Sequence, residues 1–257
     1  MDTRSEFDRL KRASSKHDSY FQVYDRLLAP YAARRGEGLT LVEIGVQNGG
    51  SLHLWRHVFG EGARIIGIDL NPETRVLEQD GFEIFIGSQS DPAFWADFFG
   101  RIGPVDIVID DGGHTDYQQL VTFFCCLDSI RDGGLLVTED VHTSYMPMFG
   151  NPSNYSFASF AKRVVDAIMS RSGMIGVSVG PSIHQKVFSV DFYESIIAFH
   201  IDRRRCFPGK PVTASGESFT STECRYQDNS INKLNVLDEI ARYFAIVKLQ
   251  QTKSDGA

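Results

Sequence analysis

Acidic residues gather in two short motifs of the sequence, each at the end of an apolar run. Asp110 and Asp111 follow VDIVI, and Glu139 and Asp140 follow GLLVT. Unpaired, these carboxylates would repel one another strongly, so water, a lysine or a bound cation must offset their charge. Carboxylate oxygens suit a hard ion such as Mg²⁺ or Ca²⁺ rather than Zn²⁺. We therefore expect Asp111, Glu139 and Asp140 to be the ligands of a divalent cation.

A second candidate site lies at the first glycine-rich turn, where LTLVEIG (39–45) leads into VQNGGS. Glycines at such a turn let the backbone approach a ligand closely. A dinucleotide site would show G-x-G-x-x-G, but Gln47 stands at the third position, and Glu43 precedes the first glycine by two residues. A carboxylate at this turn favours S-adenosylmethionine, which carries a sulfonium and an ammonium and no phosphate.

Polar residues after the next two apolar runs complete this candidate donor site. Asp69 ends ARIIGID and could accept hydrogen bonds from both ribose hydroxyls. The segment GSQSD (87–91) ends the third run, at the edge where ligands of open α/β sheets bind. It could line the adenine pocket. The predicted donor-binding residues are Glu43, Gly45, Gly49, Ser51, Asp69, Ser88, Gln89 and Asp110.

The elements that must position these residues recur in a regular order. Five apolar runs rich in Val and Ile alternate with amphipathic stretches such as SLHLWRHVF and PAFWADFFGRI, which predicts parallel strands joined by helical crossovers. The runs at 186–194 and 195–202 follow closely enough to pair antiparallel at the sheet edge. The fold class is therefore α/β, with a doubly wound, mostly parallel, Rossmann-like sheet of seven strands. Such a terminal hairpin is typical of class I methyltransferases rather than nucleotide dehydrogenases.

The chain divides into three predicted parts. Residues 1–38 form a helical extension that we expect to cover the ligand edge of the sheet, and one face of its helix carries Tyr20, Tyr24, Leu27 and Leu28. Residues 39–202 form the methyltransferase core. Residues 203–257 form a C-terminal addition, with a long loop to residue 232 and a helix over 233–247. The two additions suggest a homo-oligomer.

Charge and hydropathy argue against two classes of partner. The 257 residues carry a formal net charge of −7, which disfavours a nucleic-acid partner. No apolar stretch approaches the roughly 20 residues that cross a bilayer, and the charged start MDTRSEFDRLKR is unlike a signal peptide. We therefore expect a cytoplasmic protein that acts on a small molecule, without nucleic acid or membrane as partner.

The sequence resembles two families of methyltransferases, and these resemblances indicate which reaction to expect. Catechol O-methyltransferases place a metal-binding Asp after the fourth strand, an acidic pair after the fifth, and their general base three residues after the first Asp. His114 holds that base position here. More narrowly, EIGVQNGGS, GIDLNP, GSQSDPAF, DIVIDDGGHTDYQ and GGLLVTEDVHTSYMPMFG resemble the metal-dependent sugar O-methyltransferases of macrolide biosynthesis (mycinamicin type), over roughly residues 16 to 202. This resemblance implies S-adenosylmethionine and Mg²⁺ as cofactors, Asp111, Glu139 and Asp140 as metal ligands, and His114 as general base.

The expected reaction is methylation of a hydroxyl group, with a sugar or glycosylated natural product as the acceptor. His142 and Tyr145 follow the acidic pair and are candidates for contacting the acceptor, although Tyr145 is equally compatible with packing in a turn. Two alternatives stay open. One is the same fold acting on a phenolic or other small-molecule acceptor, and the other is a non-catalytic binding module whose acidic cluster is a structural cation site. A dehydrogenase fits less well, because of Gln47 and the terminal hairpin.

Overall fold

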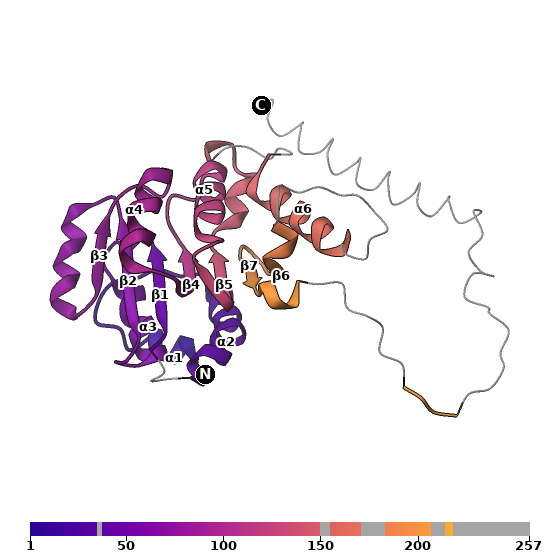
Figure 1. The fold of residues 1–257 in the computed structure, drawn as a ribbon. Helices are drawn as coiled ribbons and strands as arrows, with labels where there is room; N and C mark the ends of the chain where they lie inside the picture. The colour runs from indigo at the N-terminus through magenta and orange to yellow at the C-terminus, as the bar shows by residue number, and fades with distance from the viewer. Residues whose placement is uncertain (35–37, 150–154, 171–182, 207–213, 218–257) are drawn as a thin grey trace. The chain divides into compact units, whose positions relative to one another are not determined.

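The computed structural model describes residues 1–34, 38–149, 155–170, 183–206 and 214–217 (Figure 1). The chain divides into two units, residues 1–209 and 210–257. In the second unit, the described residues 214–217 are irregular backbone. The predicted helix over 233–247 and most of the predicted loop over 203–232 lie outside the described residues.

The first unit is built on a sheet with the strand order β3-β2-β1-β4-β5-β7-β6. The strands are β1 (Thr40–Ile44), β2 (Arg64–Asp69), β3 (Glu83–Ile86), β4 (Val105–Asp110), β5 (Ile130–Thr138), β6 (Val187–Phe192) and β7 (Ile197–Ile201). Strands β1 to β5 run parallel, and β7 runs antiparallel to β5 and β6. This confirms the predicted sheet. The chain leaves β3 at one edge and returns to β4 beside β1, so ligands are expected at the carboxyl ends of β1 and β4.

Helices cover both faces of the sheet (Figure 1). They are α1 (Thr3–Phe7), α2 (Asp18–Ala32), α3 (Gly50–Phe59), α4 (Pro92–Ile102), α5 (Asp116–Cys126) and α6 (Phe157–Met169). Successive strand residues point to opposite faces, which produces two hydrophobic clusters. Leu41 and Ile107 pack with α2 and α3 on one face, whereas Val42 and Val108 pack with α4, α5 and α6 on the other. The predicted face of α2 is buried as expected.

Short 3₁₀ helices link these elements: η1 (Pro72–Asp80), η2 (Val141–Tyr145), η3 (Pro147–Phe149), η5 (Ile183–Gln185) and η6 (Arg203–Arg205). Strand β5 begins before the apolar run GLLVT, because Ile130 pairs with Val105 across a register shift. It ends at Thr138, so Glu139 and Asp140 follow directly after its last residue.

Capping side chains stabilise the first turns of the helices that begin at the ligand edge of the sheet. Thr115 and Gln118 form a capping box at the start of α5, in which each side chain satisfies a backbone N–H of the other residue. Asp91 caps α4 by accepting a hydrogen bond from the backbone of Ala93. These caps fix where the loops after β3 and β4 end, and so they limit how far the loop side chains can move.

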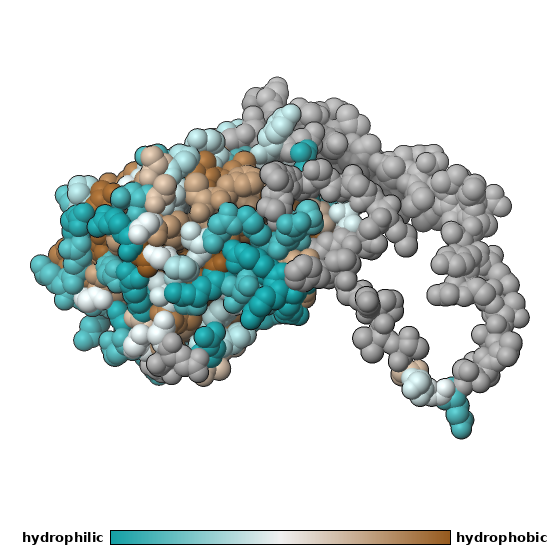
Figure 2. Space-filling view, viewed as in Figure 1, coloured by the Kyte–Doolittle hydropathy of each residue, from teal (hydrophilic) through white to brown (hydrophobic). Residues whose placement is uncertain are grey.

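The visible face of the first unit is largely hydrophilic, with hydrophobic residues gathered near α4 and α5 (Figure 2). Two large apolar side chains of α5, Tyr117 and Phe124, are exposed. None of the helices in the described part of the chain is both long enough and apolar enough to cross a membrane.

Candidate active site

Two adjoining cavities lie at the carboxyl ends of β1 and β4, and they share Gly45, Gln47 and Asp111. The first, which we call the acidic cavity, has a volume of about 260 Å³. Its wall includes the segment 13–17 and the side chains of Tyr20, Ser51, Asp111, His114, Glu139 and Asp140. The second, which we call the glycine-rich cavity, has a volume of about 230 Å³, and its wall includes Gly45, Asp69, Gly87, Gln89, Gly112 and Gly113.

Gly45 makes the close approach between the two strand ends possible. Its φ is +87°, in the region that favours glycine, and a Cβ there would lie 2.0 Å from the carbonyl oxygen of Asp111. Its N–H donates to the carbonyl of Ile68 at 2.9 Å. A side chain at this position would therefore push the end of β4, and Asp111 with it, away from β1.

Asp69 organises the same turn through its carboxylate. Oδ2 accepts hydrogen bonds from the backbone N–H groups of Val46 and Gln47, both at 2.9 Å, and Oδ1 accepts one from Asn71 at 2.9 Å. The sequence analysis assigned this residue to ribose, and the structure adds a role in shaping the loop. A carboxylate has about four acceptor positions, so Asp69 keeps capacity for a hydroxyl in the glycine-rich cavity.

Gln89 connects the end of β3 to the end of β4. Its Nε2 donates to Oδ1 of Asp110 at 3.0 Å and to Thr122 at 3.1 Å, and its Oε1 accepts from the N–H of Gly113 at 2.8 Å. Asp110 is buried, and this burial raises the pKa of its carboxyl to about 6. Asp110 thus supports Gln89 from behind and does not itself line either cavity.

Lys16 occupies the floor of the acidic cavity. Its Nζ lies 2.5 Å from Oδ2 of Asp111 and 2.7 Å from Oε2 of Glu139, and 2% of its side chain is exposed. Burial alone would lower the pKa of Lys16, but the adjacent Glu139 and Asp111 outweigh burial and raise it. Lys16 is therefore a permanent positive charge inside the site.

Glu139 is held from two sides. One carboxylate oxygen faces Lys16, and the other accepts a hydrogen bond from the hydroxyl of Tyr24. Burial raises the pKa of Glu139, the nearby Asp111 raises it further, and Lys16 opposes both effects. Glu43 lies behind this group, fully buried, and its pKa is raised to about 7 by burial. Neither oxygen of Glu43 has a hydrogen-bond partner among the described residues.

Asp111, His114 and Asp140 converge on one point of the acidic cavity. One ligand atom from each lies within 4.8 Å of the others. Nε2 of His114 lies 3.5 Å from Oδ2 of Asp140 and 3.9 Å from Oδ1 of Asp111. Both His114 and Asp140 have positive φ, 60° and 54°, a strained backbone that is often found at functional sites.

The charges of this group favour a bound cation. Lys16 brings one positive charge, whereas Asp111, Glu139 and Asp140 bring up to three negative charges in a partly dehydrated space. Carboxylate oxygens are the ligands that Mg²⁺ prefers. The residues therefore fit a divalent ion, with Asp111 and Asp140 converging as predicted, and Glu139 separately engaged by Lys16 and Tyr24.

Some of the predicted site residues line a cavity, and others lie outside both cavity walls. Gly45, Ser51, Asp69 and Gln89 line a cavity, and so do the three predicted metal ligands and His114. Four predicted donor residues lie outside both cavity walls, as do both acceptor candidates: Glu43, Gly49, Ser88 and Asp110, and His142 and Tyr145. Of the two acceptor candidates, His142 lies beside Asp140, and Tyr145 is 52% exposed and away from both cavities.

Sequence reasoning missed the contribution of the segment before α2. Lys16, His17 and Tyr20 line the acidic cavity, yet none of them was assigned to the site. A signal was present, because the excess of acidic residues required a lysine or another cation, and Lys16 immediately precedes the helix expected to cover the ligand edge.

Comparison with known proteins identifies the fold of this site. Residues 42–141 match a family model described as a methyltransferase domain. A tetracenomycin enzyme, 8-demethyl-8-alpha-L-rhamnosyl tetracenomycin-C 2'-O-methyltransferase of Streptomyces olivaceus, is 35% identical over 160 residues, which cover 58% of this chain and 41% of that protein. Mycinamicin VI 2''-O-methyltransferase of Micromonospora griseorubida is 36% identical over 157 residues, which cover 56% and 38%. The chain thus spans less than half the length of these relatives.

A solved structure supports the same fold. The MycE methyltransferase from the mycinamycin biosynthetic pathway, in complex with Mg and SAH, has a TM-score of 0.71 and 25% sequence identity to this chain. The match covers 85% of this chain and 57% of that one. The predicted class I fold is therefore confirmed. The chain therefore has the fold of the class I methyltransferases, and residues 42–141 match the methyltransferase-domain model.

Proposed function

We propose that the chain is an S-adenosylmethionine-dependent O-methyltransferase that requires Mg²⁺ and methylates a sugar hydroxyl of a glycosylated natural product. The observation that carries the proposal is the junction of the two cavities at Gly45, Gln47 and Asp111. A donor that extends from the glycine-rich cavity to this junction would present its methyl group to the acidic cavity, where the cation and the base would lie.

The glycine-rich cavity suits the adenosine part of the donor. Asp69 would hold the ribose hydroxyls, and Gln89 would border the base, because both line this cavity at neighbouring strand ends. Ser51 and Gly45 border the other cavity and would contact the methionine part. The donor supplies an electrophilic methyl group on a sulfonium, so the protein mainly has to align it with the acceptor.

The acidic cavity suits the cation and the acceptor. Asp111 and Asp140 would hold the ion, and Glu139 remains a third candidate ligand whose oxygens Lys16 and Tyr24 now occupy. When bound, Mg²⁺ supplies Lewis-acid activation and orientation of the acceptor hydroxyl. Lys16 keeps Glu139 and Asp111 oriented, and it lowers the negative charge that the donor and the acceptor would meet.

In this proposal, His114 accepts the proton of the acceptor hydroxyl. Its Nε2 faces the carboxylates of Asp111 and Asp140, so these two groups would stabilise the imidazolium that forms. Its Nδ1 is buried and has no hydrogen-bond partner among the described residues. We therefore assign the base role to Nε2 of His114.

The acceptor class rests on the relatives, whose names specify methylation of a rhamnosyl group or of mycinamicin VI. Neither predicted acceptor contact lines a cavity, and His142 is the better of the two because it lies beside Asp140, which lines the acidic cavity. Self-association of the chain stays a prediction.

Calorimetry and methyl-transfer assays test the proposal together. The protein should bind S-adenosylmethionine with or without EDTA, and it should transfer labelled methyl to rhamnosylated tetracenomycin C or mycinamicin VI only when Mg²⁺ is present. Transfer to catechol but to neither glycoside would favour the phenolic alternative. Donor binding without transfer to any of these acceptors would favour a binding module with a structural cation site, and full activity after rigorous chelation would reject the role of the metal.

A further inference from the structure

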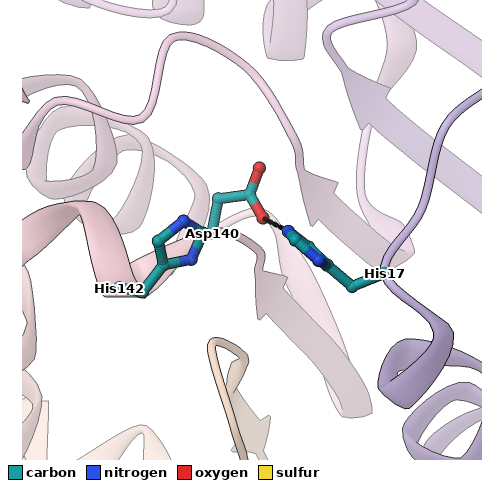
Figure 3. Close-up of side chains that lie close together, drawn as sticks. All are labelled: His17, Asp140 and His142. Atoms are coloured by element: carbon teal, nitrogen blue, oxygen red, sulfur yellow. Dashed lines mark ion pairs between the residues drawn. The ribbon is translucent and has the colours of Figure 1, made fainter.

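We propose that His17, Asp140 and His142 form a second cation site, which binds a transition-metal ion such as Zn²⁺ or Co²⁺. The three side chains come from two distant parts of the sequence, the residue before α2 and the turn after β5. Figure 3 shows the carboxylate of Asp140 between the two imidazole rings.

The geometry is compatible with a shared ion. One ligand atom from each of the three residues lies within 4.8 Å of the others. Nε2 of His17 is 4.0 Å from Oδ1 of Asp140, and the ring centroids of His17 and His142 are 5.7 Å apart at an interplanar angle of 88°. Ring movements on the order of 1 Å would bring these atoms to the roughly 2.0–2.2 Å that zinc requires.

This site shares Asp140 with the acidic cluster of Asp111, His114 and Asp140, but it faces the other oxygen of that carboxylate. Oδ2 of Asp140 faces His114, whereas Oδ1 faces His17. Oδ1 also accepts the hydrogen bond of the Tyr20 hydroxyl, so an ion between the histidines would use the remaining lone pair of this oxygen. The carboxylate would then hold one ion through each oxygen. An ion between the histidines would not need to displace one held by Asp111.

The donor atoms determine which ion each position prefers. Two imidazole nitrogens and one carboxylate oxygen suit Zn²⁺, Co²⁺ or Ni²⁺, and catalytic zinc sites commonly have three protein ligands of this kind with one open position. Mg²⁺ prefers oxygen ligands and binds imidazole poorly. Millimolar Mg²⁺ should therefore leave the histidine site free.

Two of the three ligands are already held in place. The Tyr20 hydroxyl is hydrogen-bonded to Asp140 and, at 2.9 Å, to Ser195, and Ser195 is in turn bonded to Nδ1 of His142. Such outer contacts orient the ligands of metal sites. The His17 side chain is 63% exposed, so it can swing to admit an ion from solvent.

A cobalt titration tests the site without any methyl transfer. Tag-free protein is titrated with Co²⁺ in millimolar Mg²⁺ and followed by visible absorption. We expect one equivalent to bind with the intense bands of low-coordinate cobalt. His17→Ala should weaken this binding at least about 10-fold, since even outer-shell changes cost that much. His57→Ala is the matched control, because His57 is a partly exposed histidine that pairs with Glu6 elsewhere on the unit.

Two further variants separate this site from the acidic cluster. Asp111→Asn should leave the cobalt spectrum in place, and His142→Ala, checked for folding by circular dichroism, should weaken it as His17→Ala does. Equal cobalt affinity in wild type and His17→Ala would overturn the proposal. So would a spectrum that is lost in Asp111→Asn and kept in His17→Ala, because the ion would then lie in the acidic cavity. The outcome is independent of whether the chain transfers methyl groups.

Discussion

The acidic cavity and the glycine-rich cavity share three residues, yet they are built in different ways. The wall of the glycine-rich cavity comes from residues 44–118, in loops that follow successive strands. Backbone N–H groups and the side chains of Asp69 and Gln89 satisfy each other there. The acidic cavity is completed by residues 13–20, which precede the whole sheet, and it buries charge. One half of the site is thus a product of local turns, and the other depends on a long-range ion pair.

The two cavities should therefore differ in the free energy that is lost when one interaction is removed. In the glycine-rich cavity, a neutral hydrogen bond such as that from Gly113 to Gln89 contributes about 0.5–1.5 kcal/mol, and one to the Asp69 carboxylate about 1.5–3 kcal/mol. Removing one partner of a buried ion pair costs about 3–5 kcal/mol, because the other charge is left uncompensated. We therefore expect changes in the acidic cavity to have the larger effects, on chemistry and on stability alike.

The largest expected effect is on the chemical step. His114→Ala should lower kcat about 10²–10⁴-fold, which is the usual contribution of a positioned general base. Donor affinity should stay nearly unchanged, because His114 lines the acidic cavity and not the glycine-rich one. Initial rates with labelled donor and calorimetry with S-adenosylhomocysteine measure the two quantities. A variant that keeps wild-type kcat would move the base role elsewhere.

The next effect is on folding. Lys16→Met in EDTA should lower the free energy of unfolding by about 3–5 kcal/mol, because Asp111 and Glu139 lose their buried counter-ion. Added Mg²⁺ should restore part of the loss by neutralising the same carboxylates. Urea denaturation measures both. Lys11→Met, at an exposed position, is the control and should stay within about 0.5 kcal/mol of wild type. Equal stability of the two variants would remove Lys16 from the site's energetics.

A smaller effect tests the glycine-rich cavity. Asp69→Asn keeps the size of the side chain and one carbonyl oxygen, but it loses the charge that strengthens hydrogen bonds from ribose hydroxyls. Donor affinity should fall by about 1.5–3 kcal/mol in calorimetry. At saturating donor, kcat should change little, since Asp69 lies outside the acidic cavity. A large fall in kcat with unchanged donor affinity would contradict the assignment of donor binding to the glycine-rich cavity and of the chemical step to the acidic cavity.

The smallest effect is expected outside both cavities. His53 and His57 stand four residues apart on α3, a spacing that can bind metal, but the structure pairs them with Asp80 and Glu6 respectively. His57→Ala should change the free energy of unfolding by less than about 0.5 kcal/mol and leave magnesium binding intact. Thermal unfolding with and without Mg²⁺ provides the measurement, and a lost magnesium response would reveal a metal role for the histidines of α3.

The parallel strands and the acidic residues that follow them could be predicted from the amino-acid sequence. Apolar runs and their alternation with amphipathic stretches specify parallel strands, because only strands buried on both faces tolerate such continuous apolar character. Since carboxyl ends of parallel strands meet at one edge, Asp69, Asp111 and Asp140 could be assigned to one site without knowing any contact. His114 could be assigned to the same site, because it follows Asp111 by three residues in the sequence.

The partners of these residues could not be predicted from the sequence, because they depend on how distant segments pack together. The pairing of Lys16 with Glu139, and of His17 with His142, joins positions more than a hundred residues apart, and no periodicity in the sequence reports such a contact. It depends on how α2 packs across the sheet, which side-chain volumes in the core set. The hydrogen bonds of Asp69 to the first turn likewise require the exact approach of β2 to β1. The parallel strands therefore follow from local pattern, whereas charge compensation at the site follows from packing.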